Sequence, residues 1–238
     1  MNFDLSEFAD IIRRANDQNH FEGKDGREYS VDNEGNVEPL THDPIEAPLK
    51  LTQLTSLVDW FKRDGDAEKM LIHVVSPTKV EVVGELDYQG MRPKYVEVNA
   101  IVPEIEYDRF YDQEAMIITL QSKFGYTNDR DLLLKVIGNL REEKVNQQTD
   151  DGVSQSVQIN SGVASVSEVK VPNPVVLTPY RTFQEVSQPA STFVFRMREG
   201  MRSALFEADN AGWQVDAKTY IKDYLQKHID NEKVTVLA

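Results

Sequence analysis

The chain of 238 residues contains no cysteine, which excludes disulfide bonds, thiolate metal ligands and a cysteine nucleophile. Histidine is scarce: the chain has four, and none lies three or four positions from another, so the spacing typical of a zinc site is missing. No Walker-type phosphate loop and no dinucleotide-binding glycine motif occurs. We therefore expect no cofactor, no bound metal ion and no enzymatic activity.

Long apolar runs and an excess of basic residues are also missing. No apolar run approaches the ~20 residues that span a bilayer, and the first 17 residues lack the basic and apolar regions of a secretory signal. The chain has 26 Lys and Arg against 40 Asp and Glu, which gives a net charge of −14. Such acidity disfavours nucleic acids and anionic membranes as partners. We expect a cytoplasmic protein that does not bind membranes.

The acidic charge is concentrated near the N-terminus. Residues 1–48 hold twelve Asp and Glu against four Lys and Arg, a net charge of −8. Apolar residues at helical spacing predict an amphipathic helix over residues 4–17, and residues 29–38 predict a short hairpin that turns around Gly35. We therefore interpret residues 1–48 as an N-terminal helix followed by an extended acidic arm or hairpin.

Residues 49–238 are interpreted as one α+β domain with a mostly antiparallel sheet and several amphipathic helices, its β-rich half starting at about residue 146. Helical periodicity predicts helices over 52–63, 112–123, 128–145 and 216–229, with Asp112, Asn128 and Asp216 as N-caps of the last three. Alternating β-branched residues predict a hairpin around Ser76–Lys79 and further strands near 95–103, 153–160, 163–171, 174–178, 192–198, 203–207 and 233–237.

Proline is concentrated in one segment. Four of the ten prolines, Pro172, Pro174, Pro179 and Pro189, lie within eighteen residues. Proline fixes φ and cannot donate to a sheet ladder, so this composition predicts an extended structural strap. Tyr180 and Phe183 are expected to be buried where the strap turns.

Arginines accompany the strap and the strand that follows it. In residues 192–198, Phe193, Phe195 and Met197 share one face, whereas Arg196 and Arg198 share the other. Together with Arg181 and Arg202, these arginines form a candidate anion-binding or interface face. The alternative is that they pair with the abundant carboxylates of the chain or of a second subunit.

Two carboxylates, Glu207 and Asp209, lie near a strand end and are weak candidates for metal ligands. They are followed by Asp216 and Lys218, a combination that metal-dependent nucleases also use. Asp216 as a helix N-cap explains its position without a metal ion.

The sequence PNPVVLTPYRTFQEVSQPASTFVFRMREG at residues 172–200, followed by ALFEADNAGW and an amphipathic helix, resembles the C-terminal signature of the YfdQ-like family of phage and prophage proteins, a domain of unknown function. The segment APLKLTQLTSLVDW at residues 47–60 resembles the early helix of that family. The resemblance implies a phage or prophage context and expression in the cytoplasm of an infected host. It brings no catalytic residues.

The leading hypothesis is a non-enzymatic, self-associating phage accessory protein that acts as a scaffold, a shell or a sequestering binder. Its expected partner is a second copy of itself, with a host or phage protein as a further partner. One alternative is a nucleic-acid-associated protein of phage replication or recombination that uses the face of Arg196 and Arg198. The other is a metal-dependent hydrolase that uses Glu207 and Asp209.

Overall fold

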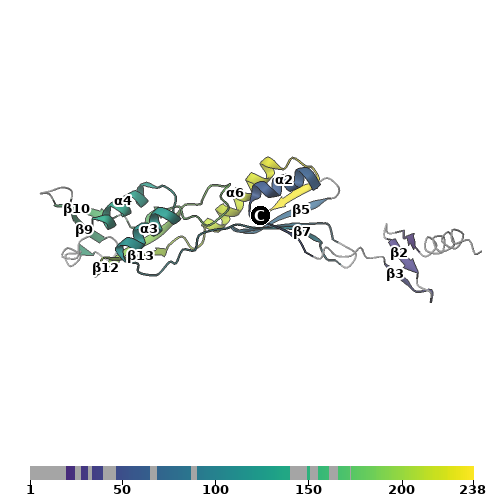
Figure 1. Ribbon diagram of the computed structural model, residues 1–238, viewed down its shortest axis with the longest axis horizontal. Helices are drawn as coiled ribbons and strands as arrows, with labels where there is room; N and C mark the ends of the chain where they lie inside the picture. The colour runs from purple at the N-terminus through teal and green to yellow at the C-terminus, as the bar shows by residue number, and fades with distance from the viewer. Residues whose placement is uncertain are drawn as a thin grey trace, which may run out of the picture. The chain divides into compact units, whose positions relative to one another are not determined.

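The computed structural model describes residues 20–24, 28–31, 34–39, 47–64, 69–86, 90–139, 149–150, 155–160, 166–171 and 173–238 (Figure 1). The chain divides into two units, Met1–Glu46 and Ala47–Ala238. The described residues form four helices and fourteen strands in mostly antiparallel sheets, so the predicted α+β class is confirmed. The helix predicted over residues 4–17 lies outside the described residues.

The first unit contains a small antiparallel sheet in the order β1 (His20–Glu22), β2 (Glu28–Val31) and β3 (Val37–Pro39). Tyr29 lies opposite Pro39 and Val31 opposite Val37, which confirms the hairpin predicted in this region. Gly35 has a φ of 86° in the connection between β2 and β3, a conformation that glycine adopts without steric cost.

The second unit contains a five-stranded sheet in the order β14-β5-β6-β7-β4. Its strands are β4 (Leu49–Leu51), β5 (Met70–Ser76), β6 (Lys79–Val83), β7 (Lys94–Asn99) and β14 (Val234–Leu237). The predicted hairpin around Ser76–Lys79 forms β5 and β6, and β7 pairs antiparallel with β6. The two edge strands, β4 and β14, pair in parallel with β7 and β5, an arrangement that local sequence patterns did not predict.

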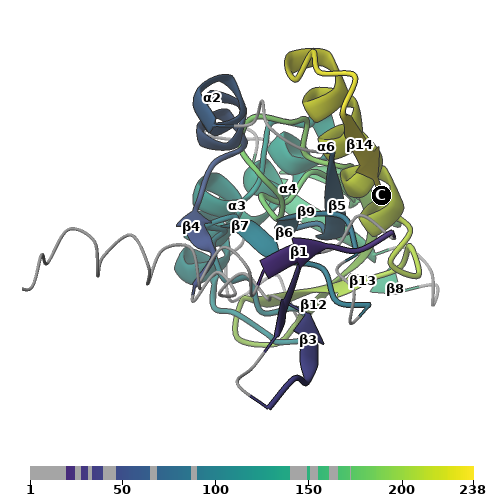
Figure 2. The same ribbon diagram turned by 90° about the vertical axis from the view of Figure 1, so that its right-hand side faces the viewer.

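Two helices cover one face of this sheet, α2 (Leu54–Asp64) and α6 (Trp213–His228), as Figures 1 and 2 show. Leu57 of α2 and Ile221 of α6 belong to one buried cluster with strand residues on the covered face, such as Ile72 and Val98. We call this cluster the five-strand core. The burial patterns of β5 and β6 alternate, as expected for strands with one covered face.

Charged side chains occupy the uncovered face. Glu81 Oε1 lies 2.7 Å from Lys94 Nζ and 2.9 Å from Lys79 Nζ, and Lys79 also reaches Glu97. Burial alone would raise the pKa of Glu81, but the hydrogen bonds and charges of the two lysines outweigh it and lower that pKa. This network pairs two lysines with two glutamates of the face within the chain.

A second layer combines the sheet β11 (Val175–Leu177), β12 (Ser191–Arg198) and β13 (Arg202–Glu207) with α3 (Gln113–Lys123) and α4 (Asn128–Gly138). Phe193 and Phe195 of β12 pack against Leu120 of α3 and Leu133 of α4. We call this cluster the three-strand core. A further antiparallel sheet contains β8 (Thr149–Asp150), β9 (Gln155–Asn160) and β10 (Val166–Val171).

The helix ends correct three details of the sequence prediction. Asp112 caps α3 as predicted, and its side chain accepts from the Ala115 N–H. The cap of α4 is Thr127, not Asn128, and this helix ends at Gly138 with Asn139 as its C-cap, while residues 140–145 of the predicted helix lie outside the described residues. Helix α6 begins at Trp213 after Gly212, so Asp216 lies inside the first turn and is not its N-cap.

Candidate functional site

The strap is described from residue 173 onward, and Pro172 lies outside the described residues. Phe124 forms a bridge with Pro179, the Gly125 N–H donates to the Thr178 carbonyl, and the Tyr180 N–H donates to the Lys123 carbonyl. A Cβ on Gly125 would lie 2.7 Å from Thr178 Oγ1, so a larger residue would force the Thr178 side chain to shift where the strap passes the end of α3. The strap therefore begins against the three-strand core.

Further along, the strap reaches the five-strand sheet. The Thr182 hydroxyl donates to the Pro77 carbonyl at 2.5 Å, in the turn between β5 and β6. Phe183 is buried in the five-strand core as predicted, whereas Tyr180 is 40% exposed, so the prediction that both rings are buried is wrong for Tyr180. Tyr180 is exposed because its backbone pairs with α3 while its side chain projects away from both cores.

The amide of Gln188 closes the turn of the strap. Its Oε1 accepts from the Arg181 and Thr182 N–H groups at 3.0 and 3.2 Å, and its Nε2 donates to the Phe183 carbonyl at 3.0 Å. Pro179 and Pro189, at the two ends of this turn, are buried, while Pro174 is exposed. One side-chain amide thus forms hydrogen bonds with three backbone groups of the strap that have no partner in a neighbouring strand.

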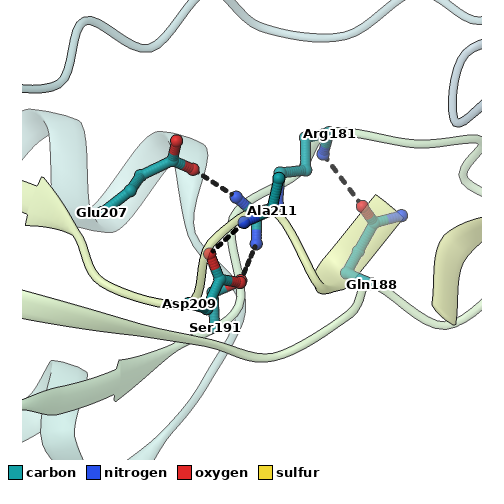
Figure 3. Close-up of polar contacts among 6 residues, drawn as sticks. All are labelled: Arg181, Gln188, Ser191, Glu207, Asp209 and Ala211. Carbon is teal, nitrogen blue, oxygen red and sulfur yellow. Dashed lines mark hydrogen bonds and ion pairs between the residues drawn. The ribbon is translucent and has the colours of Figure 1, made fainter. Parts of the chain in front are cut away.

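The side chain of Arg181 is buried, with 8% of its surface exposed. Figure 3 shows its polar contacts. Nη1 donates to Glu207 Oε1 at 2.8 Å, and Nη2 donates to the Ser191 hydroxyl, which in turn donates to Asp209. The guanidinium also stacks over the Trp213 ring, 3.8 Å from its centroid. We call this set the Arg181 cluster.

Burial and neighbouring charges set the electrostatics of the Arg181 cluster. Burial lowers the pKa of Arg181, while Tyr107, Glu207 and Asp209 oppose the shift. Burial also raises the pKa of Tyr107 to about 12, although the charge of Arg181 opposes that shift. Arg181 Nε is buried without a hydrogen-bond partner among the described residues, which is a remaining cost of burying this cation.

The two carboxylates named as metal candidates belong to this cluster. Glu207 neutralises Arg181 directly, and Asp209 accepts from Ser191 and from the Ala211 N–H at the turn before α6. Among the described residues, no group of three or more His, Asp and Glu side chains could hold a metal ion. The geometry gives both carboxylates a structural use in holding the strap to β13 and α6.

The other predicted arginines lie apart from Arg181, on the outer face of β12 and β13. Phe193, Phe195 and Met197 are buried, so the alternation predicted for β12 is confirmed. Arg196 lies opposite Ala204, and Arg198 lies opposite Arg202. The four predicted arginines therefore divide into one internal cation and an outer set of three.

An aromatic ring brought by a distant segment joins this outer set. The Arg198 guanidinium stacks over Phe110, 3.9 Å from the ring centroid, and Phe110 meets Phe206 edge-on at 6.2 Å. Phe110 is positioned because residues 108–111 run beside β13, where Tyr111 and Ser203 exchange two backbone hydrogen bonds. Sequence reasoning missed Phe110, because no local pattern indicates that its segment pairs with a strand 90 residues later.

A cavity of about 360 Å³ lies where the parallel strands β4 and β7 end and α2 begins. Thr52, Ala100 and Phe183 are among its lining residues. Glu185 Oε1 accepts from the N–H and hydroxyl of Thr55 at 3.2 and 3.3 Å, so the strap supplies an acidic partner to the start of α2.

The edges of the β11–β13 sheet and of the five-stranded sheet differ in how they are closed. Residues 108–111 cover β13 through backbone bonds, and Asp129 Oδ2 accepts from the Val176 N–H at the edge of β11. Strand β4 is three residues long and carries Lys50, features that discourage pairing. At the outer edge of β14, whose four residues Val234–Leu237 carry no charge, the Val234 N–H donates to the Asn231 carbonyl at 3.0 Å. Among the described residues, no other strand pairs with this edge, so it is open at Val236.

No protein-family model matches this chain, and no match was found among curated proteins or solved structures. The resemblance of residues 172–229 to the YfdQ-like family therefore stays a prediction. Within the described part of the chain, no helix is long and apolar enough to cross a membrane.

Proposed function

We propose that the protein is a non-enzymatic, self-associating protein, and that two copies pair through the edges of their β14 strands. The open edge of β14 is the observation that carries this proposal, because unpaired strand edges are templates for a further strand. The cellular context proposed here, a phage or prophage accessory protein in the host cytoplasm, rests on the family resemblance alone. A scaffold, a shell or a sequestering binder would all use such an interface, and a host or phage protein would be a further partner.

The proposed pairing has a register that follows from which residues of β14 face its open edge. The Met70 N–H donates to the Lys233 carbonyl, and Val234 lies opposite Met70, so alternate residues of β14 bond to β5. Val236 lies between those residues and turns its N–H and carbonyl toward the open edge. Two copies related by a twofold axis would pair Val236 with Val236 of the second copy, in antiparallel orientation.

In this register, Thr235 lies opposite Leu237 of the second copy. Both side chains are exposed, and Leu237 has 47% of its surface exposed. The Cα atoms of such a directly opposed pair without backbone bonds lie ~4.5 Å apart, within the range that a disulfide bridges. Because the chain has no cysteine, introduced thiols would report on this interface without interference.

The test uses disulfide trapping of full-length protein under mild oxidation. The double variant Thr235→Cys/Leu237→Cys is expected to form a covalent dimer, and so is an equimolar mixture of the two single variants. Each single variant alone should remain uncrosslinked. In this register the same position in the two copies forms a diagonal pair, with ~7–8 Å between the two residues, which is too far for a disulfide. A second variant, Thr235→Lys/Leu237→Lys, is expected to halve the molar mass measured by light scattering, because lysine opposes edge pairing.

The control is Leu86→Cys/Ile118→Cys, which places two thiols on exposed sites outside β14. Equal crosslinking of this control would contradict the proposal. A wild-type chain that remains monomeric by light scattering at every concentration tested would also refute it.

A further inference from the structure

The outer face of the β11–β13 sheet is positively charged in a chain that is acidic overall. Outside residues 1–48 the chain has 28 acidic residues (40 minus 12) and 22 basic residues (26 minus 4), so this larger part has a net charge of −6. By the strand register, the positions on this side of the sheet are Val194, Arg196 and Arg198 on β12 and Arg202, Ala204 and Phe206 on β13. Ala204 is buried, whereas Arg198 and Arg202 are exposed. None of these positions carries an acidic residue.

Arg198 and Arg202 form an unfavourable pair in the isolated protein. They lie directly opposite each other across the ladder, and like charges in this position destabilise a sheet. Arg198 stacks on Phe110, and Arg202 Nε donates to the Glu199 carbonyl at 3.4 Å. Neither arginine forms an ion pair with a carboxylate among the residues that the structure describes. Two exposed guanidinium groups that share no acidic partner are a site for an anion.

Aromatic rings lie beside these cations. Phe110 and Phe206 contact each other edge-on, and both are partly exposed on the outer face. A guanidinium and a phenyl ring stacked at 3.9 Å provide flat surfaces on which a base stacks. Phosphate groups are suited to pair with the arginines, and unstacked bases are suited to stack on the phenyl rings. A duplex offers only the phosphates, because its base faces are already stacked.

We propose that this face, formed by Arg198, Arg202, Phe110 and Phe206, binds single-stranded nucleic acid. Arg198 and Arg202 hold phosphate oxygens, for which the guanidinium fork is better suited than a lysine ammonium. A base stacks against the Phe110 ring and its neighbour Phe206. The negative charge elsewhere on the chain keeps this binding local and dependent on salt concentration. The site is separate from β14, so this inference does not depend on self-association.

The test is fluorescence anisotropy with full-length protein and a labelled oligothymidylate of about 12 nucleotides, a length within the site sizes of single-strand binders. Binding is measured between about 50 and about 200 mM salt. Each phosphate contact to a single strand contributes about −0.7 to the slope of log K against log salt concentration, so Arg198→Ala/Arg202→Ala is expected to reduce the slope by about 1.4. The same variant should raise Kd about tenfold or more at the lowest salt concentration.

The aromatic contribution is tested separately. Phe110→Leu removes the stacking surface without removing charge, so Kd is expected to rise about fivefold or more while the salt slope stays unchanged. Arg198→Lys keeps the charge and is expected to preserve the slope while weakening the binding. These two variants decide the question if the double alanine variant does not fold.

The matched control is Lys62→Ala/Lys69→Ala, which removes the same charge from two highly exposed side chains outside this face. It should bind like the wild type. The inference is overturned if the wild type does not bind at about 50 mM salt, if a duplex of the same length binds as tightly, or if the control loses as much affinity as the double arginine variant.

Discussion

At Arg181, one side chain joins three segments that are distant in the sequence. Its guanidinium contacts Glu207 at the end of β13, Ser191 at the start of β12 and Trp213 at the start of α6. Burying a cation is costly unless its charge and donors are compensated. Here two carboxylates, a hydroxyl and an aromatic face compensate the charge and the two terminal nitrogens, while Nε is left without a partner among the described residues. The same arrangement explains why Arg181 is unavailable to an external anion.

Removal of the Arg181 side chain should therefore destabilise the protein. Arg181→Ala leaves Glu207 and Asp209 without their cation and opens a void beside Trp213, so the free energy of unfolding is expected to fall by about 3 kcal/mol. Because Glu207 is 40% exposed, solvent screening limits the loss to the lower end of the range for buried pairs. Urea unfolding measures the change.

Arg202→Ala provides the comparison at an exposed arginine with no carboxylate partner among the described residues. Its effect on the free energy of unfolding should stay within about 0.5 kcal/mol. Equal effects of the two substitutions would show that the Arg181 cluster does not stabilise the fold.

Among the elements, α4 shows how backbone conformation selects between two suitable capping residues. Thr127 and Asn128 are adjacent, and both residue types are common N-caps. Thr127 has the extended conformation of a cap, with φ −144° and ψ 156°, and its hydroxyl accepts from the Arg130 N–H at 3.0 Å. Asn128 is already helical, so its amide is not in the capping position.

The structure predicts different costs for the two substitutions. Thr127→Ala leaves the N–H of Arg130 without its side-chain acceptor and is expected to lower the free energy of unfolding by about 1 kcal/mol. Asn128→Ala removes no cap and should be neutral or slightly stabilising, because alanine has the higher helix propensity. Thermal or urea unfolding of the two variants gives the comparison, and the reverse order would contradict the assignment of the cap.

At the scale of the whole Ala47–Ala238 unit, the strap connects the two cores. It pairs with the end of α3, reaches the turn at Pro77 through Thr182 and buries Phe183 in the five-strand core. Helix α6 packs on β5 and β14, while its first residue, Trp213, stacks with Arg181. These links predict that the two cores unfold together.

Cooperative unfolding is tested with the two tryptophans of the chain. In the Trp213→Phe background, Trp60 is the single fluorescent tryptophan and packs against the five-strand core. Leu133→Ala truncates a fully buried residue of the three-strand core, and a cost of about 2–5 kcal/mol is expected. The Trp60 transition should move to lower urea concentration by the same amount as the transition followed by circular dichroism.

Leu57→Ala, in the five-strand core, is the positive control and should shift the Trp60 transition directly. If Leu133→Ala shifts the circular dichroism transition and leaves the Trp60 transition unchanged, the cores unfold independently and the strap does not couple them.

The sequence by itself determined the features that depend on near neighbours. Helical periodicity located the four described helices, and alternation located β12 with its buried phenylalanines and outward arginines. Proline content marked the strap, because proline restricts the backbone wherever it occurs. These patterns arise from local sterics and from burial of one face, so they can be read from short windows.

Only the tertiary structure decided the features that depend on distant segments. It separated the buried arginine from the three on the other side of the sheet: Arg181 donates to Glu207 and Ser191, whereas Arg198 stacks on Phe110. It also placed β4 and β14 as parallel edge strands, although parallel pairing leaves no hairpin signature in the sequence. Contacts of this kind depend on how the whole chain closes on itself, and no window of neighbouring residues contains both partners.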